Sequence, residues 1–239
     1  LMKDLTGKKI IVIGATGGIG EGITRQLLQN GATVVALSRT EEKAKGLANY
    51  VSDIQNGEFI PLAVNLDQPE NKSKLIQNQL ANTFGQFDGA IITIGVWGKT
   101  GIPLINITDD MWDQAIRDNL TSHFRASRIL VPLLKENGAL IHLSGLSADL
   151  PYPGASLIGL TNAAKKSLVL TLAAEQSQQS PRIYELIIGP IRTRERIKNG
   201  IAQNNWFNPE DIGEYSSELI LGDTPASDEP LHYLIERES

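Results

Sequence analysis

A glycine-rich stretch near the start of the chain is the first place where residue types and spacing indicate chemistry. The apolar run from Ile10 to Ile13 is followed at once by three spaced glycines and then by an amphipathic segment from Glu21 to Asn30. This order predicts a strand, a tight turn and a helix whose N-terminal N–H groups can bind a pyrophosphate. The glycines would serve the turn, the close approach of a ligand and the packing of helix on strand. The predicted phosphate-binding residues are Gly14, Thr16, Gly18, Ile19 and Gly20.

Ser38, Arg39 and Thr40 come directly after the second apolar run, where a dinucleotide's adenosine ribose would lie. A carboxylate at this place would bind the ribose 2′-hydroxyl of NAD, whereas an arginine accommodates the 2′-phosphate of NADP. No carboxylate is present, so the sequence favours NADP(H) over NAD(H). The alternative is that Arg39 is a solvated residue at a strand end.

Strands and helices alternate at short spacing along the whole chain. We therefore predict one α/β domain over residues 1–239, a doubly wound parallel sheet of about seven strands with helices on both faces. The predicted strands cover 8–13, 33–37, 59–64, 88–93, 138–143, 183–188 and 231–235. The predicted helices end near 30, 54, 84, 134, 178 and 221, and a loop without regular structure is predicted over 194–208.

Composition narrows the possible partners. Of the 239 residues, 41% are hydrophobic and 21% charged, as in ordinary globular domains. The net charge of −5 argues against a nucleic-acid partner, because no basic stripe is available. The absence of cysteine excludes disulfides, a thiolate nucleophile and Cys-ligated zinc, and we predict no metal site. No apolar run approaches the roughly 20 residues that span a bilayer. With charged residues at the N-terminus instead of a signal peptide, we expect a cytoplasmic protein.

Six further short segments form one set of motifs together with the glycine stretch. They are Leu5–Lys8, Phe84–Asp88, Trp112–Asp113, Asn119, Gly189–Thr193 and Pro209–Asp211. Together with Gly14, Gly18 and Gly20, this set resembles the short-chain dehydrogenase/reductase family over nearly the whole chain. The resemblance implies a Rossmann-type fold and hydride transfer between a nicotinamide cofactor and a carbonyl/alcohol pair. It also implies a homo-oligomer, a dimer or tetramer, that associates through two long helices and the terminal strand.

The same resemblance assigns cofactor contacts further along the chain. Asn65 stands where the family usually has an aspartate against the adenine, and its side-chain oxygen can still accept a hydrogen bond. Leu66 follows it, and Gly95 is the glycine that remains after the fourth strand. Thr193 resembles the residue that holds the nicotinamide carboxamide. The alternative for Thr193 is an ordinary loop residue or a helix cap.

The family's Tyr-x-x-x-Lys pair is not present. In the alignment that fits best, the tyrosine position holds Ile158, the lysine position holds Asn162, and the serine position holds Gly145. Sliding the helix so that Lys165 takes the lysine position puts Thr161 in the tyrosine position. Neither alignment supplies a phenol, whose pKa near 10 could be tuned for proton transfer.

Other residues are candidates for the missing proton donor. Tyr152 lies in the loop before the active-site helix, Ser144 and Ser147 are possible oxygen ligands, and His142 is a possible general acid. The alternative for Tyr152 is packing within the loop, and for the two serines an ordinary place in a turn. For His142 the alternative is a histidine at a strand end whose hydrogen bonds are satisfied. Asn119 is kept without its usual lysine partner, and we favour a structural role for it. The candidate catalytic residues are Asn119, Ser144 and Tyr152.

Two functions remain open at this stage. One is an NADP(H)-dependent reductase with a relocated proton donor, acting on a small-molecule substrate that the sequence does not identify. The other is a catalytically silent NADP(H)-binding sensor or scaffold. Lys165 and Lys166 are predicted to form a solvated helix face. Trp97, Trp206 and Phe207 are predicted either to line a pocket or to cover the core.

Overall fold

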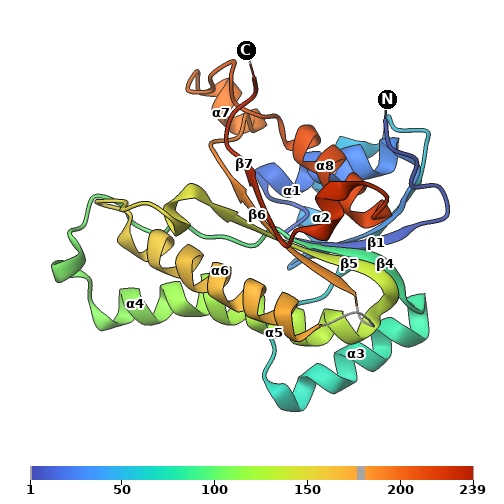
Figure 1. The fold of residues 1–239 in the computed structure, drawn as a ribbon, viewed down its shortest axis with the longest axis horizontal. Coiled ribbons are helices and arrows are strands. Elements are labelled where there is room, and N and C mark those ends of the chain that lie inside the picture. Colours follow the sequence, from blue (N-terminus) through green and yellow to red (C-terminus); the bar gives the residue numbers. More distant parts are fainter. Residues whose placement is uncertain (1, 177–180, 239) are drawn as a thin grey trace.

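The computed structural model describes residues 2–176 and 181–238 and contains one seven-stranded sheet. All strand pairs are parallel, in the order β3-β2-β1-β4-β5-β6-β7 (Figure 1). The strands are β1 Lys9–Ile13, β2 Thr33–Ser38, β3 Glu58–Ala63, β4 Phe87–Ile92, β5 Leu134–Gly145, β6 Arg182–Ile188 and β7 Leu231–Leu234. The chain reverses its winding direction between β1 and β4, which is where the predicted doubly wound sheet should carry its ligand.

Helices cover both faces of this sheet, as predicted. Figure 1 shows α1, α2 and α8 on one side and α3, α5 and α6 on the other. The helices are α1 Gly18–Gln29, α2 Glu41–Val51, α3 Glu70–Phe84, α4 Asp109–Ile116, α5 Ser122–Leu130, α6 Ser156–Glu175, α7 Arg194–Lys198 and α8 Pro209–Leu221. The predicted helix end near Gln178 lies outside the described residues.

The strand sequences explain the two layers. Ile10 and Val12 of β1 join the core beneath α1, α2 and α8, whereas Ile11 and Ile13 join the core beneath α3, α5 and α6. Successive side chains of a strand point to opposite faces, so a strand covered on both sides must be apolar throughout. The continuous apolar run that the sequence carries here is therefore the signature of a central strand.

The long helix predicted up to residue 134 is divided in the structure. A π-helical turn over Arg117–Thr121 separates α4 from α5, and a 3-10 turn over Val131–Leu133 follows α5. Pro132 in that turn lacks an N–H group and cannot continue an α-helix. As a result β5 begins at Leu134, four residues earlier than the predicted start at Gly138.

Candidate active site and cofactor pocket

The turn after β1 requires glycine at two positions. Gly14 has a φ of 77°, and a Cβ atom there would lie 2.5 Å from Thr93 Oγ1. A Cβ atom at Gly20 would lie only 2.0 Å from the Gly14 carbonyl oxygen. Thr93 fixes the same turn from β4, because its hydroxyl donates toward Ile13 O at 2.9 Å and Gly14 O at 3.0 Å. The turn is thus held tightly against the ends of β1 and β4.

The first turn of α1 faces a pocket of about 380 Å³. Its N-cap residue, Gly17, provides no side-chain acceptor for the helix N–H groups. Those groups and the positive end of the helix dipole therefore remain available to an anion, which fits a pyrophosphate. The pocket is lined by Gly17, Gly18, Ile19, Gly20, Thr93, Gly95, Thr193, Glu195, Arg196, Asn199 and Ile201.

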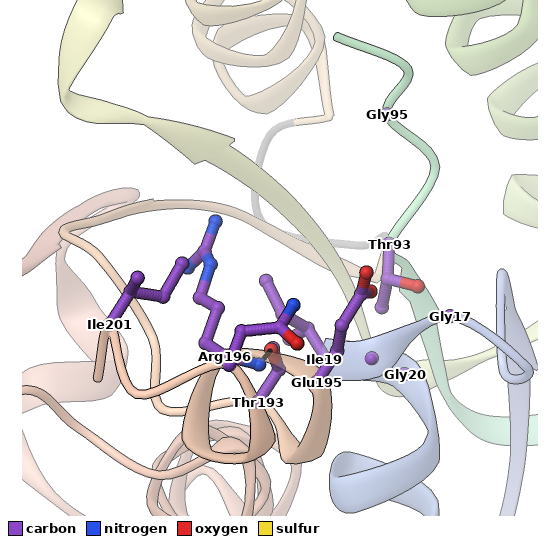
Figure 2. Close-up of a pocket in the computed structure, with 11 residues that line it drawn as sticks. Gly17, Ile19, Gly20, Thr93, Gly95, Thr193, Glu195, Arg196 and Ile201 are labelled. Carbon is purple, nitrogen blue, oxygen red and sulfur yellow. Dashed lines mark hydrogen bonds between the residues drawn. The ribbon is translucent and has the colours of Figure 1, made fainter.

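Figure 2 shows how the pocket is enclosed, with the glycine turn on one side and α7 on the other. Thr193 is the N-cap of α7, where its hydroxyl accepts from Arg196 N at 3.3 Å. Its Cγ2 atom would be 3.0 Å from a Cβ at Gly18, so Thr193 packs directly on the turn. Arg194 adds an ion pair with Glu21 of α1 at 2.6 Å. Thr193 is therefore a helix cap and a pocket residue at once.

The sequence interpretation missed the α7 side of the pocket. The segment after Thr193 was expected to be an irregular loop, yet it places Glu195, Arg196 and Asn199 beside the glycine turn. Little in this segment indicated a helix, because Thr193 is followed three residues later by a basic residue. The one usable signal was the position of the segment, directly after the residue predicted to contact nicotinamide.

At the end of β2, the side chains of Ser38, Arg39 and Thr40 differ in whether they remain free to bind a ligand. Ser38 is buried and donates to Thr40 O at 2.9 Å, and the Thr40 hydroxyl caps α2 by accepting from Lys43 N at 3.3 Å. Arg39 is exposed, and within residues 2–176 and 181–238 no acidic side chain forms an ion pair with it. The guanidinium is consequently the group at this strand end that can receive an anion.

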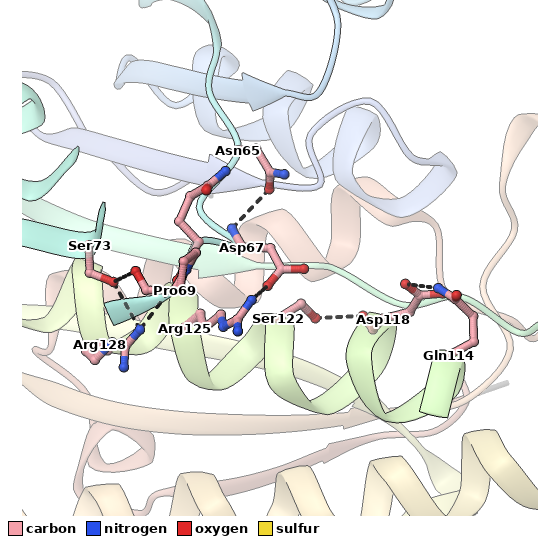
Figure 3. A network of polar contacts seen from close by, with 10 residues as sticks. Asn65, Asp67, Pro69, Ser73, Gln114, Asp118, Ser122, Arg125 and Arg128 are labelled. Carbon is pink, nitrogen blue, oxygen red and sulfur yellow. Dashed lines mark hydrogen bonds and ion pairs between the residues drawn. The ribbon is translucent and has the colours of Figure 1, made fainter. Parts of the chain in front are cut away.

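The loop after β3 is tied to α5 by a polar network (Figure 3). Asn65 Oδ1 accepts from Asp67 N at 3.0 Å, and Asp67 pairs with Arg125 at 2.9 Å. The Asn65 side chain is exposed and keeps its amide hydrogens for other partners. Leu66 is only 3% exposed, and its side chain lies in the core. A cofactor contact by Leu66 would therefore use its backbone.

At the end of β5, the structure brings Gly145, Ser147 and Asn162 together. Asn162 Nδ2 donates to Ser147 Oγ at 2.9 Å and lies 3.2 Å from the Cβ position of Gly145. Ile158, one helical turn earlier, is 5% exposed and has an apolar side chain. Asn162 of α6 therefore forms an amide–hydroxyl pair with Ser147 of the preceding loop, where Asn162 takes the expected lysine position and Ser147 lies two residues after the expected serine position.

The three candidate catalytic residues are separated in the structure. Tyr152 is half exposed, and its ring stands edge-on to Trp97 with a centroid distance of 5.9 Å. The Ser144 hydroxyl oxygen is buried, with no hydrogen-bonding partner among the described residues. Asn119 binds both backbone groups of Val96, accepting from N at 2.7 Å and donating to O at 2.9 Å. This bond pair gives Asn119 the structural role that we favoured, at the π turn.

The prediction that Lys165 lies on a solvated helix face is wrong. Lys165 is 2% exposed, whereas its neighbour Lys166 is partly exposed and pairs with Asp149 at 2.5 Å. The reason is helical spacing, because position 165 follows the buried Ile158 by seven residues and Asn162 by three. Lys165 is not among the residues that line the pocket. Trp206 and Phe207 are partly buried, and Phe207 packs against the core.

Lys165 faces a second buried charge, Glu185 of β6, which is 0% exposed. Neither carboxylate oxygen of Glu185 has a partner in hydrogen-bonding geometry among the described residues. Burial lowers the pKa of Lys165 to about 8, opposed by the charge of Glu185. Burial raises the pKa of Glu185 to about 7, opposed by the Ser144 hydroxyl, which is close but outside hydrogen-bonding geometry, and by the charge of Lys165. Burial thus acts against the charge of both groups, and their mutual attraction acts in favour of it.

His142 is not a general acid in this structure. It is fully buried beside Glu185 on the neighbouring strand, and burial together with the charge of Lys165 lowers its pKa to about 3. Its Nδ1 lies 3.1 Å from Nδ1 of His123, whose Nε2 lies 2.7 Å from Ile94 O. A carbonyl only accepts, so His123 donates through Nε2 and His142 donates through Nδ1. Both imidazoles are neutral and fully used as structural links.

Within the described part of the chain, no group of three or more metal-ligating side chains comes together. The helices that the structure describes also lack the combination of length and apolar character that crossing a membrane requires.

Comparisons with known proteins agree with this geometry. Residues 14–213 match the profile of the family described as Enoyl-(Acyl carrier protein) reductase. The dehydrogenase/reductase SDR family member 4 of Caenorhabditis elegans is 27% identical over 207 residues, covering 86% of this chain and 76% of that protein. The 3-oxoacyl-(acyl-carrier-protein) reductase FabG of Thermotoga maritima is 22% identical over 222 residues, covering 88% and 89%.

A solved structure extends the comparison to the fold. L-sorbose reductase from Gluconobacter frateurii, complexed with NADPH and L-sorbose, superposes with a TM-score of 0.84 at 19% identity, covering 99% of this chain and 98% of that one. With the parallel sheet, the glycine turn and the family match over most of its length, the chain belongs to the short-chain dehydrogenase/reductase family.

Proposed function

We propose that this protein is an oxidoreductase that binds NADP(H) and reduces a carbonyl compound or oxidises the matching alcohol. The observation that carries the proposal is the uncapped N-terminus of α1 at the glycine turn, which offers N–H groups to a pyrophosphate. When bound, the cofactor supplies the hydride, and the protein has to position it and exclude competing reactions.

The preference for NADP(H) is supported by Arg39. Its exposed guanidinium at the end of β2 stands where a 2′-phosphate would be received, and no carboxylate occupies the neighbouring positions. Titration of the protein's fluorescence with NADPH and NADH tests this directly. Equal affinity for the two cofactors would contradict the NADP(H) preference and leave the oxidoreductase proposal standing.

For proton transfer we propose Tyr152, assisted by Ser147 and Asn162. Tyr152 carries a half-exposed phenol, and its Cβ and that of Ser147 both pack against Gly159 of α6. Asn162 donates to Ser147 Oγ, which leaves the Ser147 proton available for a substrate oxygen. Among our sequence candidates, Ser144 and Asn119 remain only supporting residues, because one is sealed off and the other is bound to Val96.

Replacing Tyr152 with Phe tests the enzymatic function. General acid catalysis contributes about 10²–10⁴-fold, so we expect kcat to fall by that factor while the NADPH dissociation constant stays unchanged. Ser147→Ala should lower kcat as well, and Tyr233→Phe, which removes a phenol near Lys166, serves as the matched control. Undiminished turnover by the Tyr152→Phe variant would exclude this phenol as the donor.

The second candidate is a catalytically silent NADP(H)-binding protein. It is favoured by the sealed positions of Lys165 and Ser144 and by the full use of Asn119. A protein that binds NADPH yet reduces no member of a broad carbonyl panel would support this function instead.

We also propose that the protein is a homo-oligomer. A groove of about 450 Å³ runs between α5 and α6 and is lined by Phe124, Val131, Leu168 and Leu172, of which Phe124 is 49% exposed. Light scattering measures the oligomeric state directly, and a monomer at micromolar concentration would overturn the proposal.

A cytoplasmic location remains part of the proposal, supported by the absence of cysteine.

A further inference from the structure

The segment that carries α7 runs from the end of β6 to the start of α8. Its two ends lie side by side, because Arg192 N donates to Phe207 O at 2.8 Å and Ile191 pairs with Phe207 in a parallel bridge. Between these ends, the segment supplies part of the lining of the cofactor pocket, namely Thr193, Glu195, Arg196, Asn199 and Ile201. The position of the segment therefore sets the shape of one side of the pocket.

The chain after β7 contacts the start of this segment. Gly189 N donates to Leu234 O at 2.9 Å, and a Cβ atom at Gly189 would lie only 2.1 Å from Ile235 O. The two backbones can approach this closely because glycine has no Cβ atom. Residues 235–237 are thereby led across the base of the α7 segment.

The same short stretch is bonded to the other end of the segment. Arg237 N donates to Asn205 O at 2.8 Å, and Asn205 Nδ2 donates to Glu236 Oε2 at 2.8 Å. Figure 1 shows the end of the chain beside α7, as these bonds require. Residues 235–237 thus join the two ends of the α7 segment, and we call them the clasp.

Arg196 connects the clasp to the pocket. Its guanidinium carbon lies 6.0 Å from the centre of the Trp206 ring, and Trp206 directly follows Asn205. Its Nη1 also donates to Ile191 O at 2.9 Å, so the side chain is held by an aromatic face and by a carbonyl. In the parts of the chain that the structure describes, 2–176 and 181–238, no carboxylate forms an ion pair with it. The guanidinium therefore keeps both its charge and further N–H donors for a ligand.

The placement of Arg196 matters because its neighbour has the opposite charge. Glu195 also lines the pocket, and Figure 2 shows both side chains rising from α7. A guanidinium forms charge-assisted hydrogen bonds with a phosphate, whereas a carboxylate repels it. Which of the two side chains meets a bound nucleotide depends on how α7 is held.

We propose that the clasp positions Arg196 for contact with the phosphate groups of the bound nucleotide. Glu236 and Asn205 are positioning residues, because they fix the turn that carries Trp206. Arg196 is the binding residue. This role rests on the proposed NADP(H) binding, but the clasp is present without a nucleotide and is measured separately from it.

Hydrogen exchange followed by mass spectrometry measures the clasp in the full chain without nucleotide. The reporters are the hydrogen-bonded amides of Ile197, Asn199 and Ile201. Glu236→Ala should speed their exchange about twofold, which corresponds to about 0.5 kcal/mol, the low end for a net hydrogen bond, because both partners are exposed. Glu236→Gln keeps an acceptor oxygen and should restore the parent rate. Glu238→Ala removes a neighbouring exposed carboxylate and is the matched control.

Titration calorimetry with NADPH and NADH measures the consequence for the pocket. Arg196→Ala should weaken the binding of both nucleotides by about tenfold or more, since a hydrogen bond to a charged group contributes about 1.5–3 kcal/mol. Glu236→Ala should weaken both equally by up to about twofold, because only the fraction of competent pockets falls. In the Arg196→Ala background, Glu236→Ala should have no further effect on binding. Glu195→Gln should strengthen the binding of both nucleotides.

Three results would overturn the proposal. They are amide exchange that Glu236→Ala leaves unchanged, exchange that Glu236→Gln fails to restore, and equal weakening by Glu236→Ala with and without Arg196. A parent protein that binds NADPH as tightly as its Arg196→Ala variant would refute this inference alone. A parent protein that binds neither nucleotide would refute the proposed function and the role of Arg196, whereas faster exchange in Glu236→Ala would still support the clasp.

Discussion

Two regions at the carboxyl ends of the strands differ in how their polar groups are used. After β1 and β2, two groups remain open, the uncapped N–H groups of α1 and the exposed Arg39. Around β5, β6 and α6 they are enclosed, as with Asn119 on Val96 and with Lys165 beside Glu185. A polar group that is exposed and has no partner can bind a ligand, whereas an enclosed one mainly affects stability and the protonation of its neighbours. The open region is the one that we propose to bind the cofactor, and the enclosed region holds the residues whose chemistry has to be tested.

The largest effect should come from breaking the enclosed pair. Lys165→Met leaves Glu185 without its counter-charge, and loss of one partner of a buried pair costs about 3–5 kcal/mol. The double variant Lys165→Met/Glu185→Leu should recover most of that loss. Urea denaturation measures both, with Lys166→Met as the matched control, because a partly exposed pair contributes only about 0–1 kcal/mol. A Lys165→Met variant as stable as the parent would show that the pair is solvated.

Gly20→Ala tests the open region. Its Cβ would meet the Gly14 carbonyl oxygen at 2.0 Å, so backbone has to move, and overpacking of this kind costs about 1–3 kcal/mol. We expect lower stability together with weaker NADPH binding. Gly17→Ala, whose Cβ would lie at an ordinary 3.4 Å from the same oxygen, should leave stability unchanged. Equal stability losses in the two variants would mean that the turn is not tightly packed.

Arg39→Ala sharpens the assignment of the open region to NADP(H). Removing a charge-assisted contact to the 2′-phosphate should weaken NADPH binding by about 1.5–3 kcal/mol and leave NADH binding unaltered. Lys43→Ala, on the first turn of α2, controls for a general loss of positive charge. Isothermal titration with both cofactors makes the measurement, and parallel weakening of NADH would refute the assignment.

The last prediction concerns the pH dependence of stability. The raised pKa of Glu185, about 7 in the folded state against 4.5, contributes stability below pH 4.5 that is lost as pH rises toward 7. The lowered pKa of Lys165, about 8 against 10.5, contributes stability above pH 10.5 that is lost as pH falls toward 8. The pair thus contributes least between pH 7 and 8. Glu185→Gln should remove the acid side of this minimum in urea titrations at several pH values, and an unchanged profile would contradict the shift.

The sequence was sufficient for most of the fold, because central parallel strands and amphipathic helices leave strong periodic patterns. It was insufficient where one residue changes the path of the chain, as Pro132 does before β5. The glycine turn could also be predicted, since its residues are adjacent in sequence and each has a local steric reason.

The reaction side of the site could not be predicted in the same way. Its geometry depends on contacts between distant segments, such as Asn162 with Ser147 and Trp97 with Tyr152. The prediction for Lys165 was wrong for a different reason. A lysine in a helix usually faces water, so its residue type was given more weight than its helical spacing, which indicates burial.

The Arg194–Glu21 pair, which ties α7 to α1, bears on how long a nucleotide stays bound. The Arg194 side chain is 61% exposed, and a pair of this kind contributes only about 0–1 kcal/mol. Salt screens exposed charges and should weaken this tie. We therefore expect higher ionic strength to shorten the time that a nucleotide stays bound between the two helices.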